Sequence, residues 1–138
     1  MSWQLYALLS AIAAGATAVL AKIGVEGVPS NLATAIRTVV ILIFVSVIVA
    51  ARGEHRLLVA VSPRALLFLV VSGCGTGLSW LAYFRALQIG PASRVAPVDK
   101  LSLAVTLILA AFVLGERITF QVAGGVALMI VGALLTLR

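Results

Sequence analysis

The sequence predicts an all-α membrane protein with five transmembrane helices, and its composition is the first reason. Hydrophobic residues make up 63% of the 138 residues, and charged residues make up only 10%. Globular domains contain roughly 45–50% apolar and about 25% charged residues, so a soluble domain of this length has too little interior for these side chains. The composition excludes a soluble enzyme, a disordered chain and a nucleic-acid-binding domain.

The net charge is the second reason. Ten Lys and Arg residues against four Asp and Glu residues give a charge of +6. Because these basic residues are spread thinly over an apolar chain, we expect them to meet anionic lipid headgroups of a bilayer rather than a phosphate backbone.

The third reason is the length of the apolar stretches. A bilayer core of about 30 Å needs about 20 helical residues, and helices are the only open-ended structures that satisfy backbone groups in hydrocarbon. Five such stretches cover roughly residues 3–21, 32–51, 64–84, 97–114 (or 92–114) and 118–137. We expect them to form a single transmembrane domain over residues 1–138.

Turn residues separate these stretches in order along the chain. Gly24, Gly27 and Pro29 follow the first stretch, and the charged residues 52–56 follow the second. Residues 90–91 (Gly-Pro) and 115–117 (Gly-Glu-Arg) follow the third and the fourth. The first stretch lacks the basic start of a signal peptide, and four more stretches follow it, so we expect it to be a membrane span.

Five spans place the two ends of the chain on opposite faces of the membrane. The basic loop residues are Arg52, Arg56, Arg64 and Arg117 on the N-terminal face, and Lys22, Arg85, Arg94 and Arg138 on the other. Because the two faces carry equal numbers of basic loop residues, the positive-inside rule gives only a weak preference for either orientation. Two interpretations stay open: one fixed orientation with a weak bias, and dual topology, in which copies insert both ways.

Charged residues inside the spans are candidates for function. A charge at the centre of a membrane helix costs on the order of 2.5–3.5 kcal/mol, so it needs a partner or a role. Arg37 lies about two turns inside its span, and Asp99 is the sole acidic residue within a span, next to Lys100. Arg37 and Lys100 are the candidate counter-charges of Asp99. We interpret Lys22 and Glu26 as residues of the membrane interface.

Polar stripes on the third and fourth spans are further candidates. Ser72, Thr76, Ser79 and Tyr83 share one face, and Asp99, Ser102, Thr106 and Ala110 share another. Such stripes serve helix packing or line a water-filled cavity, and both interpretations stay open. The candidates for a substrate cavity and its gates are Arg37, Ser79, Trp80, Tyr83, Asp99, Lys100 and Ser102.

The last span carries a candidate packing seam. Gln121, Gly125, Leu128 and Gly132 share one face, where small residues suit close approach of two helices, within a protomer or across a dimer. No motif in the chain supports chemistry: it has no phosphate-binding loop, metal-ligand set or catalytic triad. We therefore expect no enzyme activity and no cofactor.

Several motifs resemble the EamA-like part of the drug/metabolite transporter superfamily. They are YFRALQIG at residues 83–90, ASRVAP at 92–97, LGERIT at 114–119, and the glycines at 124, 125 and 132. PVDKLS at residues 97–102 is similar to the short five-helix bacterial and archaeal branch. The last span also resembles the dimerising helix of small multidrug-resistance exporters. The resemblance implies a secondary transporter of small metabolites or drugs in the inner (plasma) membrane.

The resemblance also implies that this chain forms only one half of the usual transporter fold. Most members have ten helices in two inverted repeats, whereas this chain has one repeat. An antiparallel homodimer supplies the second repeat and places the substrate near the bilayer midplane, and balanced loop charges suit it. The alternative is a non-transporting subunit or heterodimer partner, such as a flippase for lipid-linked substrates or an assembly component.

Overall fold

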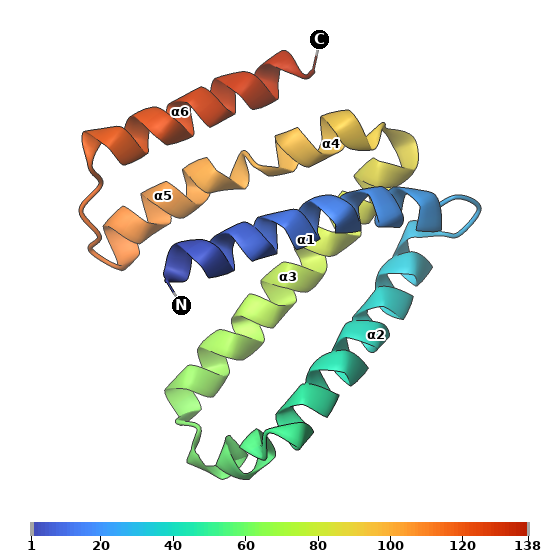
Figure 1. Cartoon of the computed structure of the whole chain (residues 1–138), viewed down its shortest axis with the longest axis vertical. Helices are drawn as coiled ribbons and strands as arrows, with labels where there is room; N and C mark the ends of the chain where they lie inside the picture. Colours follow the sequence, from blue (N-terminus) through green and yellow to red (C-terminus); the bar gives the residue numbers. More distant parts are fainter. Residues whose placement is uncertain (1, 138) are drawn as a thin grey trace. The chain divides into compact units, whose positions relative to one another are not determined.

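A computed structural model describes residues 2–137, and all regular secondary structure in that range is helical (Figure 1). The elements are α1 (Trp3–Gly24), α2 (Ser30–Ala51), the 3-10 helix η1 (Glu54–Ala60), α3 (Pro63–Ile89), α4 (Ala92–Asp99), α5 (Ser102–Val113) and α6 (Phe120–Leu135). Arg138, which the charge balance above includes, lies outside the described residues. The chain divides into two compact units, one comprising Ile23–Gln88 and the other the segments before and after it.

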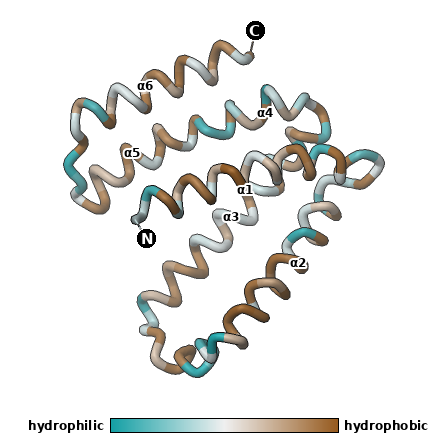
Figure 2. The backbone as a smooth tube through the Cα atoms, in the orientation of Figure 1, coloured by the Kyte–Doolittle hydropathy of each residue, from teal (hydrophilic) through white to brown (hydrophobic). Residues whose placement is uncertain are grey.

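Four helical segments of residues 2–137 are long and apolar enough to cross a membrane. They are Trp3–Gly24, Ser30–Ala51, Pro63–Ile89 and Ala92–Val113. Figure 2 shows apolar residues along α1, α2, α3, α5 and α6, with many of the hydrophilic residues at the connecting segments. These segments confirm the predicted all-α membrane class, whereas the predicted set of five equal spans is matched only in part.

The fourth segment starts at Ala92, the earlier of its two predicted starts, and differs from its prediction in being broken into α4 and α5. Pro97 lies inside α4, where it has no N–H to donate and kinks the helix. In the next turn the N–H of Lys100 donates to the Pro97 carbonyl (3.1 Å) and that of Leu101 to the Val98 carbonyl (3.0 Å). These tighter, three-residue hydrogen bonds separate the two helices.

The fifth predicted span, residues 118–137, is the shorter helix α6. Its 16 residues extend about 24 Å at 1.5 Å per residue, less than the roughly 30 Å of a bilayer core. Thr119 is extended, and its side chain accepts a hydrogen bond from the N–H of Val122 (3.3 Å). This cap fixes the start of the helix at Phe120 and leaves Ile118 outside it.

The third helix is longer than predicted at its C-terminal end. It has 27 residues and continues to Ile89, five beyond the predicted end at residue 84, because no helix-breaking residue occurs before Gly90 and Pro91. At its start the Ser62 hydroxyl accepts a hydrogen bond from the N–H of Ala65 (3.2 Å), with Pro63 in the first helical position, where proline is favoured.

The unit Ile23–Gln88 is a helical hairpin in which α2 and α3 run antiparallel and η1 joins them (Figure 1). The Gln88 side-chain amide donates to the Val28 carbonyl (3.0 Å), which ties the end of α3 to the segment before α2. The buried residues of this unit lie towards the same end of the hairpin: Val25, Ser30, Thr34, Phe84 and Leu87.

In the other unit α6 packs along α4 and α5 (Figure 1). Its inward face carries the buried Ala133 together with the half-buried Ala123, Val126 and Ile130. The Lys22 ammonium group donates to the Gly90 carbonyl (3.0 Å), so the end of α1 is joined to the segment that precedes α4.

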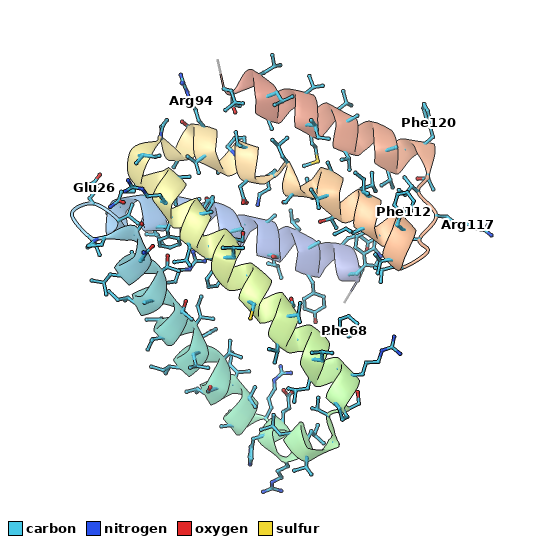
Figure 3. All side chains as sticks on the ribbon, turned by 180° about the vertical axis from the view of Figure 1, so that it is seen from behind. Glu26, Phe68, Arg94, Phe112, Arg117 and Phe120 are labelled. Carbon is cyan, nitrogen blue, oxygen red and sulfur yellow. The ribbon has the colours of Figure 1, made fainter. Side chains whose placement is uncertain are left out.

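Large apolar side chains are mostly exposed on the single chain. Phe112 and Phe120 are 86% and 94% exposed, and Figure 3 shows both extending away from the helices. In a bilayer such side chains are solvated by lipid, so their exposure fits a membrane-spanning chain. Charged residues such as Glu26 and Arg117 extend from the connecting segments (Figure 3).

Candidate functional site

An open groove of about 400 Å³ lies between α2 and α3, and it is the strongest candidate for a ligand site. It is lined by Thr38, Ile41, Leu42 and Val45 of α2 and by Gly73, Thr76, Gly77 and Trp80 of α3. This volume falls within the range of small-molecule sites, about 300–1,000 Å³, and the mostly apolar lining is also typical of them.

Residue spacing explains why these side chains share the groove. Residues three, four and seven positions apart lie on one face of a helix, as Gly73, Gly77 and Trp80 do on α3. The two glycines form the hollow: a Cβ atom built on either would have no neighbouring atom within 4 Å. At these two positions of the groove α3 therefore presents only backbone.

Arg37 stands next to Thr38 on α2, and its guanidinium group stacks on two aromatic rings of α3. The Cζ atom lies 4.6 Å from the ring centre of Trp80 and 5.4 Å from that of Phe84. Phe84 is buried, and Tyr83 meets it edge-to-face with the ring centres 6.5 Å apart. Cation–π contacts of this kind are stronger where water is excluded.

Arg37 belongs to neither ion pair among residues 2–137. Those pairs are Arg52 with Glu54 (3.8 Å) and Lys100 with Asp99 (3.3 Å). Arg37 lies about 10 Å along α2 from its start at Ser30, at a rise of 1.5 Å per residue. The aromatic stack thus holds a cation well inside a segment of membrane-spanning length.

The threonine hydroxyl groups of the polar stripes are satisfied within their own helices. Thr38 donates to the Thr34 carbonyl (2.8 Å), Thr76 to that of Ser72 (3.0 Å) and Thr106 to that of Ser102 (3.0 Å). A hydroxyl that bonds the carbonyl four residues earlier costs little in an apolar environment. The stripes are therefore less costly against lipid than their polarity suggests.

Asp99 and Lys100 lie at the break between α4 and α5. Asp99 ends α4, whose 8 residues place it about 10 Å from the start of the segment at Ala92. The Lys100 ammonium group lies 3.3 Å from an Asp99 carboxylate oxygen, although neighbours in sequence do not share a face of a regular helix. The tightened turn makes this pairing of neighbours compatible with the backbone.

The structure brings together some of the candidate residues from the sequence and leaves others apart. Arg37 contacts Trp80, and Asp99 contacts Lys100, but these two pairs belong to different units. Ser79 is exposed and does not line the groove. Ser102 begins α5 and is also exposed.

Sequence reasoning missed the groove-facing residues Gly73 and Gly77 and the buried Phe84. It selected the polar stripe of α3, of which Thr76 alone lines the groove. The usable signal was the pair of glycines four residues apart, a spacing that opens one face of a membrane helix.

The seam candidates of α6 lie on the face opposite to its inward one. On a helix of 3.6 residues per turn, Gln121, Gly125, Leu128 and Gly132 point away from the buried Ala133. All four are exposed, and Leu128 is 75% exposed. The packing of α6 on α4 and α5 therefore leaves this seam uncovered.

A second hollow, of about 290 Å³, lies along α5. It is lined by Thr106, Leu109, Ala110, Val113 and Leu114. None of these residues is charged, so this hollow lacks a group that could orient a polar ligand. The groove between α2 and α3 is the better candidate, because its lining residue Trp80 contacts the Arg37 guanidinium group.

Apolar helices of membrane-spanning length and the open groove between two of them define a multi-pass membrane protein. Comparison with known proteins gives the family: the chain belongs to the EamA-like transporter family, whose model matches residues 1–138. A relative from Sinorhizobium sp., named "Uncharacterized transporter in cobO 3'region", is 52% identical over 134 residues. The alignment covers 97% of this chain and 95% of that relative. No solved structure matches the chain.

Proposed function

We propose that this protein is a secondary transporter of small molecules in the inner (plasma) membrane, working as an antiparallel homodimer by alternating access. The observation that carries the proposal is the match of a transporter family to a chain of single-repeat length. The Sinorhizobium relative named a transporter is of nearly the same length, since the alignment covers 95% of it. Two copies in opposite orientations would supply the pair of inverted repeats found in most family members.

The groove between α2 and α3 supports this proposal because it is a mostly apolar hollow within the unit Ile23–Gln88. Transporters built from inverted repeats bind substrate where the repeats meet, near the bilayer midplane. A second copy would close such a groove and complete the site. The exposed seam of Gln121, Gly125, Leu128 and Gly132 offers a contact surface for that copy.

Arg37, Asp99 and Lys100 are the proposed gates. Asp99 is paired with Lys100, whereas Arg37 rests on Trp80 and Phe84. In this proposal the three residues exchange roles as paired gates when access changes from one membrane face to the other. In an antiparallel dimer each face carries one such set.

The decisive experiment is a pair of reporter fusions at the C-terminus, one active in the cytoplasm and the other outside it. Dual topology predicts signal from both fusions at comparable expression. Signal from one fusion alone would overturn the antiparallel homodimer and favour a subunit that needs a different partner chain. A fusion of each reporter to a single-orientation membrane protein is the control.

A further inference from the structure

We propose that Arg37, together with Trp80 and Phe84, forms the anion-binding end of the groove between α2 and α3. The transported molecule is then a small organic anion with an apolar body, such as an aromatic or short-chain carboxylate. This inference rests on the proposed function, because it names the substrate class of that transporter.

The geometry of the stack supplies the binding group. A guanidinium group is planar, and its five N–H donors point outward in that plane. The Arg37 Cζ atom lies 4.6 Å and 5.4 Å from the ring centres of Trp80 and Phe84, so the rings contact the guanidinium group through cation–π interactions, which do not use its N–H donors. Those donors match the two oxygens of a carboxylate, which arginine binds through parallel hydrogen bonds.

The charge balance of the unit Ile23–Gln88 indicates that the ligand is negatively charged. Residues 23–88 contain two acidic residues, Glu26 and Glu54. Glu54 pairs with Arg52, and Glu26 is exposed in the segment before α2. A cation deep in a membrane segment requires a counter-charge, and a substrate anion would provide it at Arg37.

The shape and lining of the groove indicate the size and polarity of the remaining part of the ligand. Beyond Thr38 the α2 wall is formed by Ile41, Leu42 and Val45, and no charged residue lines the groove. From Thr38 to Val45 it is about 10 Å long at 1.5 Å per residue, whereas a lipid chain spans about 15 Å, half of the roughly 30 Å core. A compact anion with an apolar body fits this length better than a phospholipid does.

The test is direct ligand binding by the full chain in phosphatidylcholine nanodiscs. The chain has two tryptophans, so Trp3→Phe leaves Trp80 as the sole tryptophan, which is excited selectively at wavelengths where tyrosine does not absorb. Phenylacetate and hexanoate are titrated against their neutral amides, phenylacetamide and hexanamide. We expect a saturable change in Trp80 emission, with at least tenfold tighter binding of each acid than of its amide.

Variants in this background separate the anion site from general damage. Arg37→Gln should abolish the preference for acid over amide, and Arg37→Lys, which keeps the charge, should retain part of it. Arg64→Gln is the matched control, because the Arg64 Cζ atom also lies over a ring, 6.0 Å from the centre of Phe68, but Phe68 does not line the groove, whereas Trp80 does. Gly77→Ala fills the hollow without a clash and should weaken acid and amide alike.

Three results would overturn the inference. The first is that neither acid binds more tightly than its amide, and the second is that Arg64→Gln reduces the preference as much as Arg37→Gln does. The third is that phosphatidylglycerol in the nanodisc changes Trp80 emission by itself and phenylacetate does not reverse that change. The last result would assign the groove to an anionic lipid. Binding in nanodiscs needs neither transport nor dual topology. If the chain inserts in one fixed orientation but still binds acids more tightly than amides, this inference stands and the proposed antiparallel homodimer fails.

Discussion

The neighbouring charges Asp99 and Lys100 allow a decisive test at the scale of single residues. Their side chains pair at 3.3 Å, so removing one leaves a lone charge within a segment of membrane-spanning length. A lone charge there costs on the order of 2.5–3.5 kcal/mol. We expect Asp99→Asn and Lys100→Gln each to lower membrane insertion or transport about tenfold or more, and the double variant to recover most of it.

Transport in vesicles with and without an imposed pH gradient is the measurement, with protein content quantified separately. If the double variant recovers uptake without a gradient but not gradient-driven uptake, Asp99 carries a coupling proton. Full gradient-driven transport by Asp99→Asn would exclude that role and would also show that transport does not need the pair with Lys100.

The candidate site was predictable where a residue is unusual for its surroundings. Arg37 and Trp80 stand out in an apolar span, and they meet in the structure. Gly73 and Gly77 did not stand out, because small residues also serve helix packing. Whether such a face opens onto a groove or closes against a neighbour depends on the position of α2, which no pattern within α3 encodes.

At the scale of the helix, Pro97 is the residue to test as the cause of the break between α4 and α5, because it accepts the first of the tightened hydrogen bonds. Replacing it with alanine restores a backbone donor and removes the ring that kinks the helix. We expect Pro97→Ala to convert the turn around Lys100 into regular helix. Amide hydrogen exchange in detergent should then slow by tenfold or more at Lys100 and Leu101, with no change in α6. Unchanged exchange there would show that the break has another cause.

Thr119 sets the start of α6 through its hydrogen bond with the N–H of Val122. Replacing a capping threonine with alanine costs about 1 kcal/mol. We expect Thr119→Ala to increase exchange in the first turn of α6 about fivefold and Thr119→Ser to restore protection. Equal exchange in the alanine and serine variants would show that the hydroxyl does not hold the helix end.

The first three membrane segments were predictable from apolar stretches bounded by glycine, proline and charge. The fourth and the last were predictable only in part, because hydropathy counts apolar residues and does not register the hydrogen-bond pattern. Ile118 is apolar and enters the count, yet it lies outside α6 because the extended Thr119 caps that helix. Likewise, Pro97 does not lower the hydropathy of its segment enough to reveal two helices.

At the scale of the whole molecule, the exposed seam of α6 tests how two copies meet. In a Cys74→Ser background, Leu128→Cys lies near the middle of α6, which runs from Phe120 to Leu135. In an antiparallel pair the middle residue meets its own copy, whereas Gln121 meets the far end of its partner. We expect oxidation to cross-link Leu128→Cys into dimers and to leave Gln121→Cys largely monomeric.

Val126→Cys on the inward face is the negative control, because that residue is half-buried within its own copy. A parallel dimer would cross-link at both Gln121→Cys and Leu128→Cys. No cross-link at any seam position would show that α6 does not join the copies.

Loop charge offers an independent test of orientation. Arg56→Gln with Arg117→Gln removes charge from one face, and Arg85→Gln with Arg94→Gln removes it from the other. Each double variant should insert in one orientation, because the positive-inside rule then has an imbalance to act on. We expect either alone to lose transport and their co-expression to restore it. Full activity of one double variant by itself would exclude a requirement for both orientations.

The seam of α6 is exposed within its own unit, and its pairing with a second copy would have a consequence for the protein in cells. Association with a second copy would stabilise each protomer by mass action. Thermal stability in proteoliposomes should therefore rise with the protein-to-lipid ratio. Unpaired protomers would be the preferred substrates of membrane proteases, so degradation would match the abundance of each orientation to that of the other.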